Sequence, residues 1–111
     1  MASCLGVKTY HHPAMGEIPL HLIMQALADP GRIAIVRELL AAGGRALACN
    51  EVRLSLSKAT RSHHFEVLRE AGIIFTEMNG TKCMTSLRRK ELDAHFPGLL
   101  KLVAAHSKTA V

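Results

Sequence analysis

The stretch that decides the fold is SKATRSHHFEVLREAGIIFTEMNGTKCMTSLRRK, residues 57–90. Its first half predicts a helix of about four turns, which begins after the N-cap residue Ser57 and ends at Gly72. Phe65 and Leu68 are spaced to share the inner face of this helix. Polar and basic residues occupy the other side, so one face is expected to pack on a core and the other to meet solvent or a partner.

The second half of the same stretch predicts a β-hairpin. Residues 73–78 and 81–87 are strand-like, and Asn79-Gly80 lies between them. Both of these residues tolerate the positive φ that a two-residue type I′ turn demands, so the turn is expected there. A helix-turn-helix followed directly by a hairpin is the winged arrangement.

Upstream of this stretch the sequence predicts two further helices. Apolar residues recur at helical spacing over 18–28. Asp29 is a good N-cap and Pro30 fits the first helical turn, so a second helix is expected to begin there. Gly43-Gly44 should end it.

Shorter elements complete the order. Residues 46–49 are a candidate edge strand, and residues 50–54 form at most a brief helix. The tail over 88–105 is helical, but Pro97-Gly98 should kink it or divide it into two short helices. The predicted fold class is mainly α with a small β-hairpin: a winged helix-turn-helix with the order α-α-β-α-α-β-β-α.

The chain has 111 residues, which suits one domain. A flexible N-terminal arm is expected over residues 1–17, because this stretch contains glycine and proline and shows no periodicity. The winged domain should span residues 18–107, and residues 108–111 should form a C-terminal tail.

The formal net charge of +5 favours an anionic partner, such as nucleic acid or a membrane surface. The apolar runs are shorter than the roughly 18 residues of a membrane span. The first residues lack the pattern of a secretory signal, so a cytoplasmic protein is expected. Its cysteines, Cys4, Cys49 and Cys83, should then stay reduced.

Several stretches together carry a family resemblance: ALADPGRIAIVRELL (26–40), SKATRSHHFEVLREAGII (57–74), the Asn-Gly hairpin and LRRKELDAHFPGLL (87–100). With them the chain resembles the ArsR/SmtB family of winged helix-turn-helix repressors over most of its length. The resemblance implies a dimeric cytoplasmic repressor that leaves its operator when an inducer binds.

Two features depart from the family pattern. Arg61 stands where the family usually has Val, Ile or Leu, four residues before Phe65. Its side chain is expected to reach out to a phosphate, or else to lie along the edge of the core. Residues 51–57 are about two residues shorter than usual in the family, so the supporting helix should be abbreviated.

The leading half of the long helix is the predicted DNA-reading element. It carries cations and no acid, and helix N-termini favour phosphate. The hairpin follows with four cations over residues 79–90 and again no acid, which suits a wing along a DNA backbone or minor groove. On charge alone a solvated basic face is an equal alternative. The predicted DNA contacts are Ser57, Lys58, Thr60, Arg61, Ser62, His63, Asn79, Thr81 and Lys82.

His64 has a different predicted role. It lies nearer the inner face of the helix, so a hydrogen-bonded structural histidine is expected there.

The first and last helices are the predicted dimer contacts. Leu92, Leu99 and Val103 follow a packing seam in the tail. With Leu22 and Leu27 of the first helix, they are expected to meet a second copy. Two reading helices would then lie one DNA turn apart, about 34 Å, and the operator in double-stranded DNA should be an imperfect palindrome.

The resemblance also implies a candidate metal site. Asp93, His95 and His106 match three family ligand positions, and their donors suit zinc or nickel as an inducer. The break at Pro97-Gly98 argues against it, and His106 could simply pack. Cys83 is a weak candidate for redox sensing. No cofactor is required.

Two other functions compete with operator binding. A winged domain can serve protein contacts without an operator. An enzyme is disfavoured, because the sequence lacks paired carboxylates, a glycine-rich loop and a complete metal set.

Overall fold

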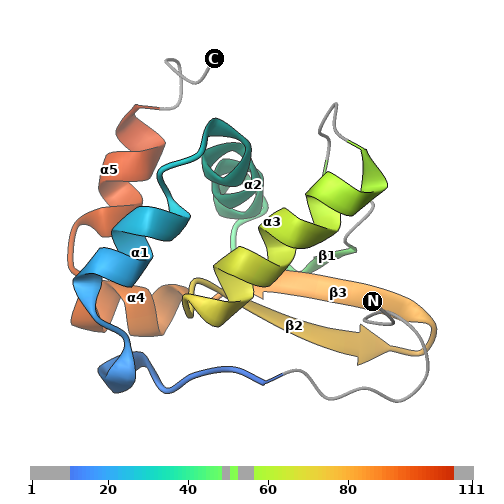
Figure 1. The fold of residues 1–111 in the computed structure, drawn as a ribbon, viewed down its shortest axis with the longest axis horizontal. Helices are drawn as coiled ribbons and strands as arrows, with labels where there is room; N and C mark the ends of the chain where they lie inside the picture. Colours follow the sequence, from blue (N-terminus) through green and yellow to red (C-terminus); the bar gives the residue numbers. More distant parts are fainter. Residues whose placement is uncertain (1–10, 49–50, 53–56, 107–111) are drawn as a thin grey trace.

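The computed structural model describes residues 11–48, 51–52 and 57–106 (Figure 1). Short helices gather on one side of the molecule, and a hairpin extends from the other. A three-stranded antiparallel sheet has the order β1-β3-β2. The elements are η1 (Met15–Glu17), α1 (Leu20–Ala26), α2 (Pro30–Ala41), β1 (Leu47–Ala48), α3 (Lys58–Glu70), β2 (Ile74–Asn79), β3 (Lys82–Leu87), α4 (Arg89–His95) and α5 (Leu99–Ala105).

This architecture confirms the predicted winged helix-turn-helix. The predicted division of the tail at Pro97-Gly98 is also confirmed, because α4 ends before it and α5 begins after it. Most of the brief helix expected over 50–54 lies outside the described residues. In the described part, none of the helices has the length and apolar character needed to cross a membrane.

The starts of α2 and α3 are fixed by the caps that the sequence predicts. Asp29 Oδ2 accepts from the backbone N–H groups of Gly31, at 2.8 Å, and Arg32, at 3.2 Å. Ser57 Oγ accepts from the N–H of Thr60 at 3.1 Å. Each cap provides a partner for N–H groups that have none within the helix.

The Asp29 cap gives a pH-dependent contribution to stability. Burial would raise the pKa of this carboxyl, but the backbone hydrogen bonds from Arg32 and Gly31 outweigh it and lower the pKa below its ordinary 3.8. The contribution is therefore present above about pH 3.8 and is lost as the pH falls through the lower folded-state value. Asp29→Ala is expected to lower the free energy of unfolding by about 1 kcal/mol at pH 7, measured by chemical denaturation. Asp29→Asn, which keeps a good cap, should lower it much less. Equal losses for both variants would exclude the cap as the cause.

The hairpin turn differs from the expected one. Asn79 pairs with Lys82, so the two-residue loop is Gly80-Thr81 and Asn79 belongs to β2. Gly80 has φ +69°, and none of the described non-glycine residues has positive φ. The predicted type I′ turn at Asn79-Gly80 is therefore wrong. A positive φ at the first central position alone suits glycine there and corresponds to a type II′ turn.

The hydrophobic core draws on every helix and on the sheet. Ile23, Ile35, Leu68 and Ile74 are fully buried. Leu92 is also fully buried, with 0% of its surface exposed, so it is a core residue. Its predicted role in a dimer contact is wrong, because the inward face of α4 packs within the chain.

The segment 11–17 is packed on the domain. His12 stacks on Phe75 with ring centroids 4.4 Å apart, and its Nε2 accepts from the backbone N–H of Thr76 on the edge strand β2. Arg69 and Arg88 donate to backbone carbonyls of the same segment, at 2.9 Å and 2.8 Å. Met15 enters the core. The structure therefore packs residues 11–17 of the predicted arm on the domain, while residues 1–10 lie outside the described part.

Candidate nucleic-acid interface

The start of α3 presents a polar, basic surface. Lys58, Thr60, Ser62 and His63 are exposed, and Arg61 is half-buried. The first turn contains no acid. Because the positive end of the helix dipole lies in the same turn, this end of α3 favours an anion.

Ser57 and Thr60 hold this turn together. Ser57 Oγ accepts from the Thr60 N–H and donates to Thr60 Oγ1 at 2.9 Å. Thr60 keeps a hydroxyl hydrogen that it can donate outward. Ser57 therefore acts first as the cap, and Thr60 is the better placed of the two to reach a phosphate or a base edge.

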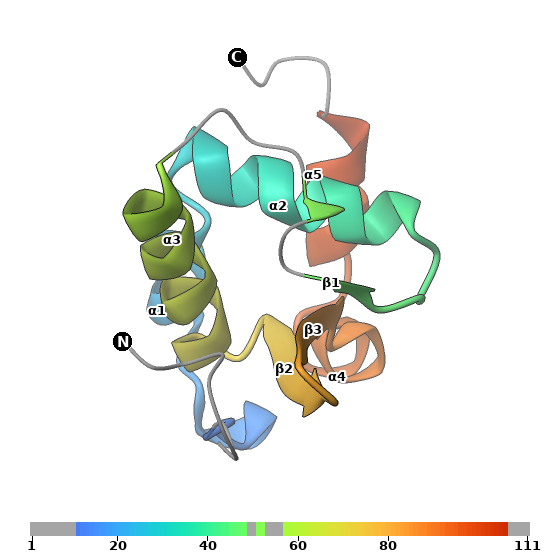
Figure 2. The same cartoon turned by 90° about the vertical axis from the view of Figure 1, so that its right-hand side faces the viewer.

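The tip of the hairpin lies on the same side of the molecule as the start of α3. Both are at the right in Figure 1 and face the viewer in Figure 2. Asn79, Thr81 and Lys82 are all exposed at this tip. The structure thus brings the two predicted groups of DNA contacts to one face.

The other cations of the predicted wing are placed elsewhere. Arg88 forms two hydrogen bonds with Glu91, at 2.9 Å and 3.0 Å, and these lower the pKa of the Glu91 carboxyl. Arg89 Nε lies 3.9 Å from Asp93 Oδ2. With Lys90, these residues follow the end of β3 that is opposite to the tip. Of the four wing cations, Lys82 alone is at the tip, so the predicted basic wing is shorter than the sequence suggests.

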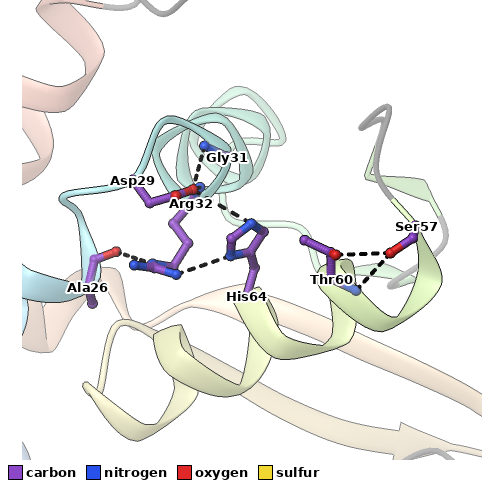
Figure 3. A network of polar contacts seen from close by, with 7 residues as sticks. All are labelled: Ala26, Asp29, Gly31, Arg32, Ser57, Thr60 and His64. Atoms are coloured by element: carbon purple, nitrogen blue, oxygen red, sulfur yellow. Dashed lines mark hydrogen bonds and ion pairs between the residues drawn. The ribbon is translucent and has the colours of Figure 1, made fainter.

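His64 packs inward from α3, as predicted. Its exposed fraction is 8%, and Arg32 Nη1 lies 3.1 Å from its Nδ1 (Figure 3). Burial lowers the pKa of His64 and outweighs the opposite effect of Asp29, whose Oδ2 lies 3.6 Å from Nε2. The ring is therefore neutral near pH 7, and the contact with Asp29 is polar rather than an ion pair.

Arg32 is the residue at this site that sequence reasoning missed. Its Nε donates to the Ala26 carbonyl at 2.6 Å, so one guanidinium joins the end of α1 to α3. One signal was present in the sequence. A cation in the first turn of a helix is unfavourable beside the positive end of the helix dipole, so Arg32 in that position indicates a specific hydrogen-bonding role.

The candidate metal ligands do not come together within one chain. Asp93 lies beside Arg89, His95 ends α4, and His106 follows α5 beyond the helix break. Over residues 11–48, 51–52 and 57–106, no group of three His, Cys, Asp or Glu side chains is arranged to hold a metal ion. Cys4 and Cys49 lie outside this part, and Cys83 is half-buried on β3.

An open apolar hollow of about 470 Å³ lies between α1, α2 and α5. Met24 and Leu102 at this hollow are more than half exposed, at 57% and 58%. Leu27 and Leu99, two of the predicted dimer residues, are half-buried in its wall, and Val103, a third, is buried there. Leu22 is exposed but does not line it. The complete lining is Met24, Leu27, Pro30, Ile33, Leu99, Leu102, Val103 and His106.

A basic helix start and a hairpin tip on the same side of a small helical domain with a three-stranded sheet define a winged helix-turn-helix protein. No protein-family model matches the sequence. Over 81 residues the chain is 38% identical to the uncharacterized HTH-type transcriptional regulator YceK of Bacillus subtilis, covering 71% of this chain and 80% of that one. The chain belongs to the HTH-type transcriptional regulators.

Solved structures agree on the fold. The transcriptional repressor BigR from Xylella fastidiosa superposes with a TM-score of 0.62 at 22% identity, over 83% of this chain and 87% of that one. The regulator HlyU from Vibrio vulnificus gives 0.60 at 24% identity, over 81% and 86%. The transcriptional repressor PagR of Bacillus anthracis gives 0.57 at 25% identity, over 76% and 90%.

Proposed function

We propose that this regulator is a dimeric, cytoplasmic repressor of the ArsR/SmtB type that binds duplex DNA with the start of α3 and the hairpin tip. The observation that carries the proposal is the placement of an acid-free, exposed helix start and an exposed tip lysine on one face. The repressor PagR, a structural relative, supports the direction of regulation.

The exposed side chains suggest a division of roles. Exposed Lys58 and Lys82, together with half-buried Arg61, would meet phosphates, which set the position of the protein on the duplex. Ser62 and His63 point outward from the reading helix and are suited to base edges in the major groove. Asn79 and Thr81 would contact the backbone beside the groove.

Two copies are expected to pair through the apolar surface around the hollow. Exposed Met24 and Leu102 line the apolar hollow, and Leu27 and Leu99 continue its apolar surface inward, which suits a contact with a second copy. A two-fold pair would present two α3 helices to successive major grooves, so the operator should be an imperfect palindrome.

Leu102→Glu tests this pairing. A carboxylate in a dry interface has no partner, so the dimer dissociation constant should rise by about tenfold or more. Ala104→Glu is the matched control, because Ala104 is exposed and lies about 200° around α5 from Leu102. Sedimentation velocity should show a dimer for the natural chain and the control, and a monomer of 12.1 kDa for Leu102→Glu. A monomeric natural chain at micromolar concentration would exclude the proposed dimer.

The competing function is a winged domain that binds proteins and no operator. Titration with a random-sequence duplex separates the two, because a DNA-binding protein should bind it with a dissociation constant of about 1–100 µM at physiological salt. Adding zinc, nickel or an oxidant to a preformed complex then tests which class of inducer releases it. An inducer can release the repressor only if it binds the DNA-free conformation of the protein more tightly than the DNA-bound conformation.

A further inference from the structure

The leading half of α3 has a single buried anchor. Among the residues of α3, only His64 and Leu68 are buried, and Leu68 lies in the trailing half. All the predicted DNA contacts of this helix precede His64, within two turns of it. Phe65 and Val67 of α3 also pack on the core but are only partly buried, so His64 is the buried contact closest to these residues.

Arg32 is the residue that holds it. Its guanidinium donates from Nε to the Ala26 carbonyl at 2.6 Å and approaches His64 Nδ1 with Nη1 at 3.1 Å (Figure 3). One side chain thus joins the last residue of α1, the first turn of α2 and the middle of α3. Gly31 permits this approach, because a Cβ there would stand 3.0 Å from both His64 Nε2 and Asp29 Oδ2.

The chemistry of the contact fixes the protonation of the ring. A guanidinium only donates, so His64 Nδ1 must accept and the hydrogen of the neutral ring must be on Nε2, which faces Asp29 Oδ2. The charged and titratable groups that face His64 are Asp29 before α2, Arg32 on α2 and His63 on α3 itself. A proton on Nδ1 would end the hydrogen bond and set two cations against each other.

We infer that His64 is a positioning residue for DNA binding: its neutral ring, by accepting from Arg32, fixes the orientation of the reading helix α3 on α1 and α2. The inference rests on the proposed function. It extends that function by assigning the placement of the reading helix to one hydrogen bond, which protonation of His64 Nδ1 would break.

Two substitutions at one position test the inference at pH 7.5 with a random-sequence duplex at low salt. His64→Asn keeps an acceptor, because its amide oxygen is attached to Cγ as Nδ1 is, and should bind within about twofold of the natural chain. His64→Leu removes the acceptor without removing charge and should bind about fivefold to tenfold more weakly. Ile35→Val, a mild core change on α2, controls for loss of stability and should leave affinity unchanged.

A pH series measures a property that would not change if His64 had a purely structural role. The ratio of the dissociation constant of the natural chain to that of His64→Asn should be near one at pH 7.5 and should rise as the pH falls through the lowered folded-state pKa of His64. The remaining side chains are the same in both proteins, so the ratio isolates the effect of replacing His64. The free energy of unfolding should also fall with pH, because the folded-state pKa of His64 lies below 6.5. The contribution of the neutral ring is complete above about pH 6.5 and is lost as the pH falls through the folded-state pKa.

The outcomes separate the inference from the proposed function. If the natural chain does not bind the duplex, the proposed function fails. The inference is then decided by hydrogen exchange without DNA, where the α3 amides before His64 should exchange faster in His64→Leu than in His64→Asn. If the natural chain binds, then equal affinity of His64→Leu, an equal loss in Ile35→Val, or a flat pH ratio would overturn the inference.

Discussion

Replacing Lys58, Arg61 and Lys82 together by alanine is expected to weaken binding to a duplex by roughly a hundredfold or more at 0.1 M salt. Each cation that meets a phosphate releases a counterion, so the plot of log affinity against log salt should lose about 0.9 in slope for each contact removed. The three residues lie at the start of α3 and at the hairpin tip, on the face shown in Figure 2. Fluorescence anisotropy over a series of salt concentrations measures both quantities.

A second variant removes charge elsewhere. Lys90 and Lys101 are exposed on α4 and α5, away from the hairpin tip. Replacing both by alanine lowers the net charge by two but should leave the salt slope within the error of the natural value. Slopes that fall in proportion to the net charge in both variants would favour a diffuse basic surface over a defined interface.

Gly72→Ala is expected to destabilise the fold by about 2–4 kcal/mol. Gly72 lies between α3 and β2 with φ +79°, a conformation that costs an L-residue energy. A Cβ at this position would also overlap Ile18 Cδ1, the end of a side chain in the core cluster, so Ile18 must leave its present packing. Urea unfolding measures the loss as a lower midpoint with an unchanged slope.

Gly43→Ala is the matched control for this prediction. Gly43 has a similar φ of +67°, but among the described residues other than its chain neighbours no atom lies within 4 Å of the place that a Cβ would take. Gly43→Ala should lower the free energy of unfolding only by the cost of a positive φ in alanine, about 1 kcal/mol. Equal losses in the two variants would mean that the packing of Ile18 on Gly72 contributes nothing.

The features that the sequence predicted correctly are local ones. The starts of α2 and α3 follow from the side chains of Asp29 and Ser57, which bond to N–H groups two or three residues away. The division of the tail follows from Pro97, which cannot continue a helix. Such features depend on a few neighbouring residues, so a single sequence contains the information needed for them.

The features that the sequence did not predict depend on how side chains and strands pair and pack in the folded chain. Leu92 follows an apolar seam that could face a partner or the core, and only the packed structure decides between them. Arg88 looked like a wing cation, but it bonds to Glu91 and to the Pro13 carbonyl. The two-residue turn lies one residue later than predicted. The register of β2 on β3 pairs Asn79 with Lys82, which leaves Gly80 as the first turn residue.

The candidate site shows the same division. Exposure of Lys58, Ser62 and His63 could be inferred from the helical spacing of the inward residues. The Arg32–His64 hydrogen bond joins residues that are 32 positions apart, so neither periodicity nor capping could reveal it. Arg61, predicted to reach outward or to lie along the core edge, is half-buried, and both placements agree with that burial.

Protection of lysines from acetylation by a bound duplex tests the proposed interface most directly. The natural chain offers lysines at the start of α3, at the hairpin tip, on α4 and on α5: Lys58, Lys82, Lys90 and Lys101. With a random-sequence duplex at low salt, Lys58 and Lys82 should become protected, while Lys90 and Lys101 should react as they do in the free protein. Equal protection of all four, or protection of Lys90 and Lys101 alone, would contradict the account.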